Sequence, residues 1–419
     1  MKKILSLTFV LVASLSFGQG VSLDELIARA KDHHPQSQQL ALIEELTDLQ
    51  VKQLAGAYLP QSSLGGQATW QSEVTSIDIS LPGVSILPPP KDQYKLTLDV
   101  QQNLWDGGLT SAQKAMAKSN GEVEKARLNT DIYKIGEQLT QLYFGVLFAD
   151  KQKANVQVLL AEINKKMNTL QAAVDNGVAV KSDFLAIKAK KIELQQQLAE
   201  IEKKKEAALE GIYLLTGQKV SPIEEFEAPV NPMVEFANST RPELTFLSAQ
   251  QKALSASEKL IKAKNLPKLV LFGTGGYGRP GLNFLARDFS PYLIGGLQLK
   301  IPLSYLYNGG QTNDLQQVKV NALRLEKQKQ SFLLASNVQL ATQQKELERL
   351  EGLIESDDQL IAIREQIRMV ADAQLENGIV TATDYLEKLD QEDLAKKSKI
   401  IHEVQLLQTQ RNIKLLLGQ

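Results

Sequence analysis

Few residues of this chain have the types and spacing of a catalytic or ligand-binding site. A glycine-rich stretch is the first candidate, because its pattern is that of a dinucleotide-binding site. The segment "LVLFGTGGYGRPG", residues 269–281, places Gly273, Gly275 and Gly278 in the pattern G-x-G-x-x-G after an apolar run. A dinucleotide site needs these glycines to open a helix, with an acidic residue about 20 positions further on. Here prolines follow instead of a helical period, and no Asp or Glu stands near that spacing. We therefore interpret the glycines as strand residues where the backbone bends or is closely approached.

The sequence also has no residue pattern that indicates a metal site, a redox site or a nucleophilic catalytic site. The chain has no cysteine, which excludes a disulfide framework, a thiolate metal site and a lipid anchor on cysteine. The three histidines, His33, His34 and His402, make no metal-ligand spacing. No nucleophile–base pair and no phosphate loop is recognisable. We expect no catalysis, no cofactor and no metal.

The first residues indicate export. Lys2 and Lys3 precede an apolar run from Ile4 to Phe17, and small residues follow it. This arrangement is typical of a secretory signal peptide, predicted over residues 1–18, and the run is too short for the roughly 20 apolar residues of a spanning helix. Removal of the two lysines would change the net charge from −1 to −3. A balance so near neutrality predicts no nucleic-acid partner.

The chain contains an internal duplication. The segment beginning "HPQSQQLALIEELT" at His34 matches the one beginning "RPELTFLSAQQKAL" at Arg241, and both run to a Leu-Pro dipeptide with the same spacing. Further matches follow in the same order: "NLWDGG" with "YLYNGG", "DNGVAVKSDF" with "ENGIVTATDY", and "LLTGQ" with "LLLGQ". We expect a first structural repeat over residues 19–220, a linker over 221–239 and a second repeat over 240–419.

Each repeat should begin with a helix and two strands. Helices are expected over about 23–58 and 242–265, because the Leu-Pro dipeptides that follow disfavour helix in the residue before proline. Alternation of apolar and polar side chains predicts strands over 61–72, 93–104, 268–279 and 291–303. In "YKLTLDVQQNL", for example, Tyr94, Leu96 and Leu98 alternate with Lys95, Thr97 and Asp99. A long loop joins the strands of each pair.

A long helix and a returning helix should complete each repeat. The stretches 109–175 and 311–376 contain no proline, and the returning helices are expected over 180–216 and 380–417. Apolar residues recur every seven positions along the long helices, which predicts coiled-coil packing. Lys153 and Arg368 interrupt this repeat, and Asn337 and Gln344 lie near it. The repeating positions are Ile132, Leu139, Val146, Leu160, Met167 and Val174 in one helix and Leu333, Leu340, Leu347, Ile354, Ile361 and Leu375 in the other.

Four amphipathic strands are an incomplete structure. A transmembrane barrel needs at least about eight strands and no open edge, because lipid offers no partner to an unpaired backbone group. The sequence therefore predicts a homo-oligomer in which several chains contribute strands.

These features together resemble the TolC family of outer-membrane efflux proteins. The resemblance is carried by the Leu-Pro entries to the strands, by "NLWDGG" and "YLYNGG", by the two Asn-Gly tips and by "LLTGQ" and "LLLGQ", and it covers the whole mature chain. It implies an α+β membrane protein: a homotrimer whose twelve-stranded β-barrel lies in the outer-membrane lipid of a Gram-negative bacterium and continues as an α-helical coiled-coil barrel in the periplasm. It also implies a passive exit duct with no enzyme activity, served by a periplasmic adaptor protein and an inner-membrane pump.

The resemblance also assigns roles to residues near the tips. Asp384 and Glu387 match acids that line the pore constriction, and Asp183 matches the aspartate of a closing network. The alternative for these acids is an ordinary solvated helix start. The family's tyrosine and arginine are absent, since Leu375 and Val380 occupy their places. The tips implied for adaptor docking comprise Asn176, Gly177, Val178, Ser182, Asn377, Gly378, Ile379 and Thr383.

Other interpretations stay open at this stage. A duct of the same kind could serve type I protein secretion or heavy-metal efflux, and a secreted coiled-coil scaffold without a pore is the alternative of another class. The strand aromatics fit either an aromatic belt at the lipid interface or ordinary packing; they are Trp70, Tyr94, Trp105, Tyr292 and Tyr307.

Overall fold

The computed structural model describes residues 21–75, 88–221, 226, 240–303 and 309–418. The predicted signal peptide, most of the predicted linker and Tyr307 lie outside the described residues. The chain folds into two compact units, one made of Met1–Gln38, Leu128–Pro242 and Phe332–Gln419, the other of Gln39–Arg127 and Glu243–Ser331. Both units draw on both sequence repeats, so a repeat is not a spatial domain.

The first helix of the chain is divided, contrary to the single helix expected over about 23–58. Helix α1, Leu23–His33, ends two residues before Pro35, where α2, Pro35–Ala55, begins. His34 between them is extended, with φ −68° and ψ 132°. The residue before a proline is pushed out of the helical region, and the same rule that we applied at the Leu-Pro dipeptides acts here as well. A 3₁₀ turn, Gly56–Tyr58, then leads into the first strand.

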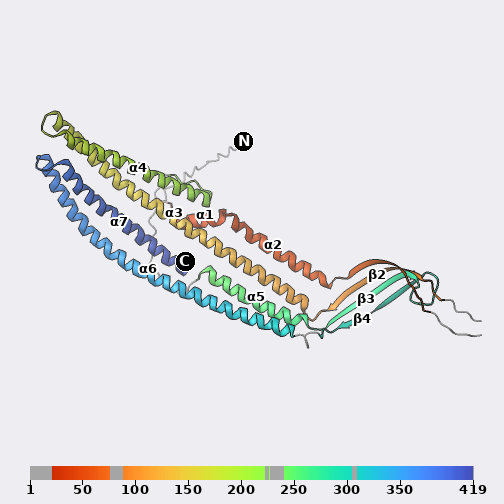
Figure 1. Cartoon of the computed structure of the whole chain (residues 1–419). Coiled ribbons are helices and arrows are strands. Elements are labelled where there is room, and N and C mark those ends of the chain that lie inside the picture. The colour runs from red at the N-terminus through yellow and green to blue at the C-terminus, as the bar shows by residue number, and fades with distance from the viewer. Residues whose placement is uncertain (1–20, 76–87, 222–225, 227–239, 304–308, 419) are drawn as a thin grey trace, which may run out of the picture. The chain divides into compact units, whose positions relative to one another are not determined.

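The four strands form one antiparallel sheet in the order β1-β2-β3-β4 (Figure 1). Their bounds are β1 Gln61–Trp70, β2 Asp92–Trp105, β3 Lys268–Arg279 and β4 Ser290–Lys300. In this sheet β2 pairs with β3, so the two sequence repeats meet at its centre. Strands β1 and β4 each have one edge without a partner strand in the described chain.

One face of the sheet is apolar and the other is largely polar. The register places Leu64, Leu98 and Leu293 on the same face of their strands, and all three are exposed. On the opposite face Asp99 accepts hydrogen bonds from Thr274 Oγ1 at 2.5 Å and from Thr97 Oγ1 at 3.1 Å. The alternation inferred from the sequence is thus present in three dimensions.

Most of the strand aromatics share the apolar face. Trp70 and Tyr94 lie near the ends of their strands that lead into or out of the long β1–β2 loop. A bulge between Asn103 and Trp105 sets Trp105 opposite Leu269, at the other end of the apolar face. Tyr292 pairs with Gly276 on the polar face and is therefore not part of this group.

The glycines of β3 make room for aromatic rings and neighbouring backbone. A Cβ on Gly276 would lie 2.2 Å from Cζ of Tyr292, and a Cβ on Gly278 would lie 2.7 Å from the carbonyl oxygen of Tyr94. A phosphate-binding turn is therefore not formed here. The close approach inferred from the sequence is the reason for these glycines.

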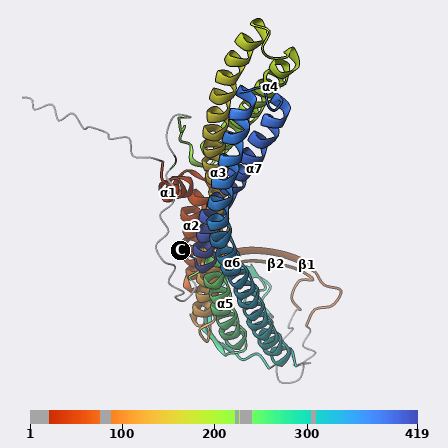
Figure 2. The ribbon, with the colours of Figure 1, turned by 90° about the vertical axis from the view of Figure 1, so that its left-hand side faces the viewer.

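The remaining helices form two hairpins. Helix α3, Leu109–Asp175, returns as α4, Lys181–Thr216; helix α6, Gly310–Glu376, returns as α7, Ala382–Leu417 (Figures 1 and 2). Helix α5, Pro242–Lys264, lies beside the first part of α6, as α2 does beside the first part of α3.

The buried seam of the long helices differs from the predicted heptad positions. Leu139 and Val146 are fully buried as predicted, but beyond Lys153 the buried positions shift to Val156, Ile163 and Leu170. In α6 the buried positions include Leu350, Asp357 and Ala371, whereas most of the predicted set is only half-buried or exposed. Each long helix therefore has a second apolar stripe that packing within the described chain leaves incompletely covered.

The turn after β2 gives a test of this fold. Gly107 and Gly108 have φ values of 67° and 80°, and a Cβ on Gly107 would lie 2.4 Å from Cβ of Leu266, whereas Gly108 has open space. We expect Gly108→Ala to cost about 1 kcal/mol for the left-handed backbone. Gly107→Ala should cost about 2 kcal/mol more, because the turn must also move away from Leu266. Thermal unfolding followed by circular dichroism measures both, and equal midpoints for the two variants would contradict this packing.

Candidate functional site

The two hairpin tips have the same backbone structure. After α3 the N–H of Gly177 donates to Val174 O at 3.0 Å and that of Val178 to Ala173 O at 2.8 Å. The corresponding bonds after α6 run from Gly378 to Leu375 and from Ile379 to Gln374. These are Schellman turns, for which glycine supplies the left-handed residue. Val178 and Ile379 are 82% and 69% exposed, so each tip presents an apolar side chain to its surroundings.

Asp384 forms a capping box at the start of α7. Its backbone N–H donates to Thr381 Oγ1 at 3.2 Å, while its Oδ2 accepts from Thr381 N at 3.0 Å and from Thr381 Oγ1 at 2.7 Å. The hydrogen bonds from the side chain and backbone of Thr381 lower the pKa of Asp384. The exposed carboxylate is therefore ionised at neutral pH.

Glu387 lies one turn further along the same exposed face of α7. Its Oε1 accepts from Lys388 Nζ at 2.8 Å and from Gln391 Nε2 at 3.0 Å. Asp384 and Glu387 thus present two carboxylates side by side, as their spacing of three predicts. Lys388 reduces the net charge of this group but leaves an acidic face.

Asp183 connects the two tips within one chain. Its Oδ1 accepts a hydrogen bond from the backbone N–H of Ala382 at 3.1 Å, joining the start of α4 to the start of α7. Ala382 itself is fully buried. The aspartate that the resemblance places in a tip network therefore makes a tip contact here, although Leu375 and Val380 stand where the family has its other polar partners.

A cluster of buried charges near the tips was not found from the sequence. We call it the clasp; it consists of Glu162, Lys166, Arg368, Tyr385 and Glu392. Tyr385, fully buried, donates to Glu162 Oε1 at 2.9 Å, and Arg368 Nη1 lies 2.6 Å from the same oxygen. Arg368 Nε also donates to Glu392 at 2.6 Å. The clasp joins α3 of the first repeat to α6 and α7 of the second.

The acidic and basic groups at the clasp stabilise one another in their charged forms. Burial alone would lower the pKa of Arg368 and of Lys166, but the neighbouring carboxylates raise both pKa values overall. For Lys166 these carboxylates are Asp372 and Glu376, which it contacts with its ammonium group. Burial, and then the charge of Glu162, raises the pKa of Tyr385. Because the pKa of Lys166 is raised on folding, its stabilising contribution is complete at neutral pH and is lost only as pH rises through the alkaline range.

The sequence carried one signal for the clasp, the interruption of the heptad pattern at Arg368. Glu162 and Tyr385 gave no such signal, because neither breaks a recognisable pattern. Further polar contacts extend the same junction: Asn155 donates to Asp393 at 2.7 Å, and Lys190 lies 2.5 Å from Asp390.

Nothing in the described residues suggests bound metal or a helical membrane span. No group of three or more His, Cys, Asp or Glu side chains in them is placed to hold a metal ion. Among the helices described, none is both long and apolar enough to cross a bilayer.

We expect Arg368→Met to destabilise the protein by about 2 kcal/mol, because Glu162 loses its arginine and Glu392, only 3% exposed, keeps Lys396 but loses Arg368. Arg349→Met is the matched control, since Arg349 pairs with Glu346 on the exposed surface of the same helix. Exposed pairs of this kind contribute little. Chemical denaturation measures the difference, and equal losses for the two variants would show that the clasp is not a stabilising element.

The capping box predicts a pH effect. In Thr381→Val the largest cause of the lowered pKa of Asp384 is removed, so that pKa should rise toward the ordinary value of 3.8. In the wild type the ionised cap stabilises the fold at pH values above the ordinary pKa of 3.8, and this stabilisation is lost as pH falls through the lower pKa of the folded state. The variant lacks this contribution, so acidification should reduce its stability less than it reduces that of the wild type. Carboxyl ¹³C titration measures the pKa. Thr383→Val is the control, and an unchanged pKa in Thr381→Val would contradict the capping geometry.

Comparison with known proteins identifies the fold. A family model described as "Outer membrane efflux protein" matches residues 26–218, which is nearly the whole first repeat. No curated protein sequence matches the chain.

Several solved structures match over almost the full length. The outer membrane protein VceC of Vibrio cholerae has a TM-score of 0.68 at 18% identity, covering 94% of this chain and 96% of its own. The CmeC outer membrane channel of Campylobacter jejuni has a TM-score of 0.67 at 15% identity, with coverages of 94% and 85%. The MtrE outer membrane channel of Neisseria gonorrhoeae, in its open state, has a TM-score of 0.67 at 16% identity, with coverages of 94% and 88%.

The duplicated sequence, the four-stranded sheet with two long helical hairpins and the match over residues 26–218 are mutually consistent: the first repeat matches the outer membrane efflux protein family, and the chain as a whole has the fold of the solved outer membrane channels.

Proposed function

We propose that this protein is the exit duct of a tripartite export system, in which three copies close a twelve-stranded β-barrel in the outer membrane of a Gram-negative bacterium. The observation that carries the proposal is the sheet of β1 to β4, which has one apolar face and two edges without partners. In lipid such edges must be paired, since no water is present to bond them.

The strand order suits closure by identical chains. Because the sheet has an even number of antiparallel strands, β4 of one copy is antiparallel to β1 of the next, and the ladder continues around a ring. Between Tyr94 and Trp105 on β2 the apolar face has leucines and a valine, with an aromatic residue near each end. This agrees with the apolar band of roughly 25 Å between aromatic girdles in transmembrane barrels. Three copies, as the family resemblance implies, supply twelve strands.

The helical part of the chain also has surfaces that other copies would cover. Leu360, Ile363 and Val370 form part of an exposed apolar stripe on α6 near its tip. Leu185 and Ile192 form another on α4. Stripes of this kind at heptad spacing are suited to helix packing between chains. They support a periplasmic tunnel formed by the hairpins of all three copies.

The tips supply the constriction and the docking surface in this proposal. Threefold repetition of Asp384 and Glu387 would make a ring of negative charge that favours cations and binds multivalent ones. The exposed turns, Asn176–Ser182 and Asn377–Thr383, would contact the periplasmic adaptor, which connects the duct to an inner-membrane pump. The Asp183–Ala382 bond and the clasp would hold the hairpins of one chain together in the resting duct.

Single-channel conductance in a planar bilayer tests the proposal. We expect a cation-selective pore that trivalent cations block. Asp384→Asn combined with Glu387→Gln should weaken that block, because the carboxylates that bind the ion are removed. Glu351→Gln combined with Glu355→Gln, two acids on the exposed surface of α6 well before the tip, is the matched control and should leave the block unchanged.

Block that is equal in all three proteins would remove the acidic-ring assignment and keep the duct. The wild-type pore could be closed at rest, so Asp183→Ala is measured as well, because it removes the hydrogen bond between the two tips and should favour opening. An assembled oligomer that does not conduct, either as the wild type or as Asp183→Ala, would contradict the duct.

A further inference from the structure

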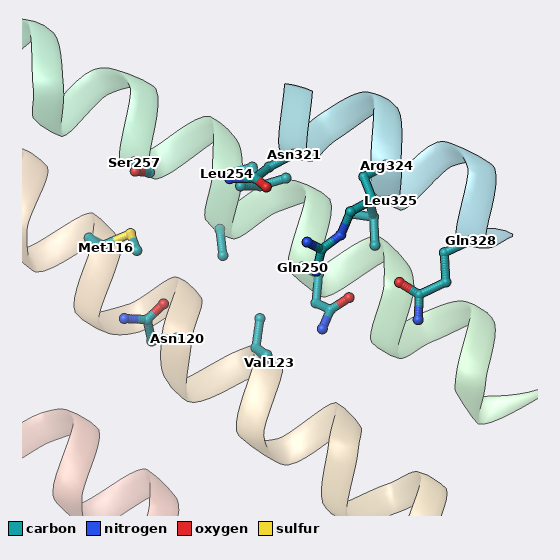
Figure 3. Close-up of a pocket in the computed structure, with 11 residues that line it drawn as sticks. Met116, Asn120, Val123, Gln250, Leu254, Ser257, Asn321, Arg324, Leu325 and Gln328 are labelled. Carbon is teal, nitrogen blue, oxygen red and sulfur yellow. The ribbon is translucent and has the colours of Figure 1, made fainter. Parts of the chain in front are cut away.

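A groove in the strand-bearing unit has properties that the duct does not require. It lies between α3, α5 and α6 and has a volume of about 420 Å³ (Figure 3). Each helix contributes side chains at positions i, i+4 and i+7, so three stripes converge on one space. This volume falls within the range of pockets that hold small organic molecules, roughly 300–1,000 Å³.

The lining combines an apolar floor with polar groups that donate hydrogen bonds. Its apolar members are Met116, Val123, Ala253, Leu254 and Leu325. The polar members are Asn120, Gln250, Ser257, Asn321, Arg324 and Gln328, and no acidic residue is among the eleven. The groove therefore carries net positive charge beside apolar surface.

Arg324 is the charged residue of the groove. Figure 3 shows its side chain extending from α6 toward Gln250 on α5. Within the part of the chain that the structure describes, no carboxylate lies within ion-pair distance of it. Two acids that are adjacent in sequence to groove residues have other partners: Glu122 lies 3.2 Å from Lys125, and Glu258 lies 2.6 Å from Lys262.

The internal repeat shows that this arginine is not a general feature of the fold. Counted along α3 and α6, which have equal lengths and end at the matching Asn176 and Asn377, the residue of the first repeat that corresponds to Arg324 is Val123. That position is apolar and lines the same groove, whereas Arg324 places a guanidinium beside carboxamides. The difference sets the second repeat apart at this place.

We infer that this groove binds a small amphipathic organic anion, with Arg324 holding its acid group. A guanidinium matches a carboxylate in a bidentate geometry, and the carboxamide N–H groups of Gln250 and Gln328 supply further donors. The leucines, Val123 and Met116 receive the apolar body of the ligand. The inference goes beyond the duct and does not depend on it, because binding is measured on the solubilised protein whether or not it conducts.

Isothermal titration calorimetry with 2-naphthoate and its neutral analogue 2-naphthamide tests this site, with the heat from empty micelles subtracted. At low ionic strength the wild type should bind the carboxylate on the order of tenfold more tightly than the amide. Arg324→Gln should abolish that preference and leave naphthamide binding unchanged. Asn321→Asp, which retains the arginine but offers it an internal partner, should also weaken naphthoate binding.

Lys327→Gln is the matched control, since it removes the same charge from the same helix outside the groove, where Lys327 donates to Gln330 on the surface at 3.0 Å. It should retain the preference for naphthoate. Equal affinity of the wild type for the two ligands would overturn the inference. So would an unchanged preference in Arg324→Gln, or an equal loss in Lys327→Gln, which would show a general charge effect.

Discussion

The unpaired edges of β1 and β4 are the constraint on which the proposed assembly depends. The sheet presents leucines and aromatic residues on one face, and that face is stable next to lipid only if every backbone N–H and C=O group at its edges is bonded. A single chain cannot bond them by curling four strands into a barrel, because known barrels have about eight strands at least. Identical chains meet the requirement because β1 and β4 are antiparallel to one another. The proposed oligomer therefore follows from the properties of the sheet itself.

The two sequence repeats do not form two separate domains. The repeats were inferred as successive segments, yet each compact unit draws on both of them. Strands β2 and β3 join the repeats at the centre of the sheet, and the clasp joins them again near the tips, where Arg368 of the second repeat meets Glu162 of the first. A duplicated sequence has thus diverged into two complementary halves. The contrast between Val123 and Arg324 is a further result of that divergence.

Local sequence patterns predicted most helices and strands, but they did not predict contacts between residues that are distant in the sequence. Strand alternation, the Leu-Pro stops and the Asn-Gly turns are encoded over a few residues, so β1 to β4 and both tips could be read directly. The break in the helix at His34 was also encoded locally, since Pro35 disfavours helix in the residue before it, as the prolines of the Leu-Pro dipeptides do. The shift of the buried seam to Val156 and Ile163 depends on which neighbour each helix packs against, and a heptad pattern does not contain that information. For the same reason Glu162 and Tyr385 were not recognised as partners, while the position of Asp183 at the tip followed from its place after the glycine.

The central claim is that three copies complete the barrel, and native mass spectrometry of the detergent-extracted protein tests it most directly. The account predicts a complex with three times the mass of one processed chain, which dissociates to single chains only under strong activation. A stable monomer, or a dimer as the largest species, would leave β1 and β4 without the partners that lipid requires and would contradict the account.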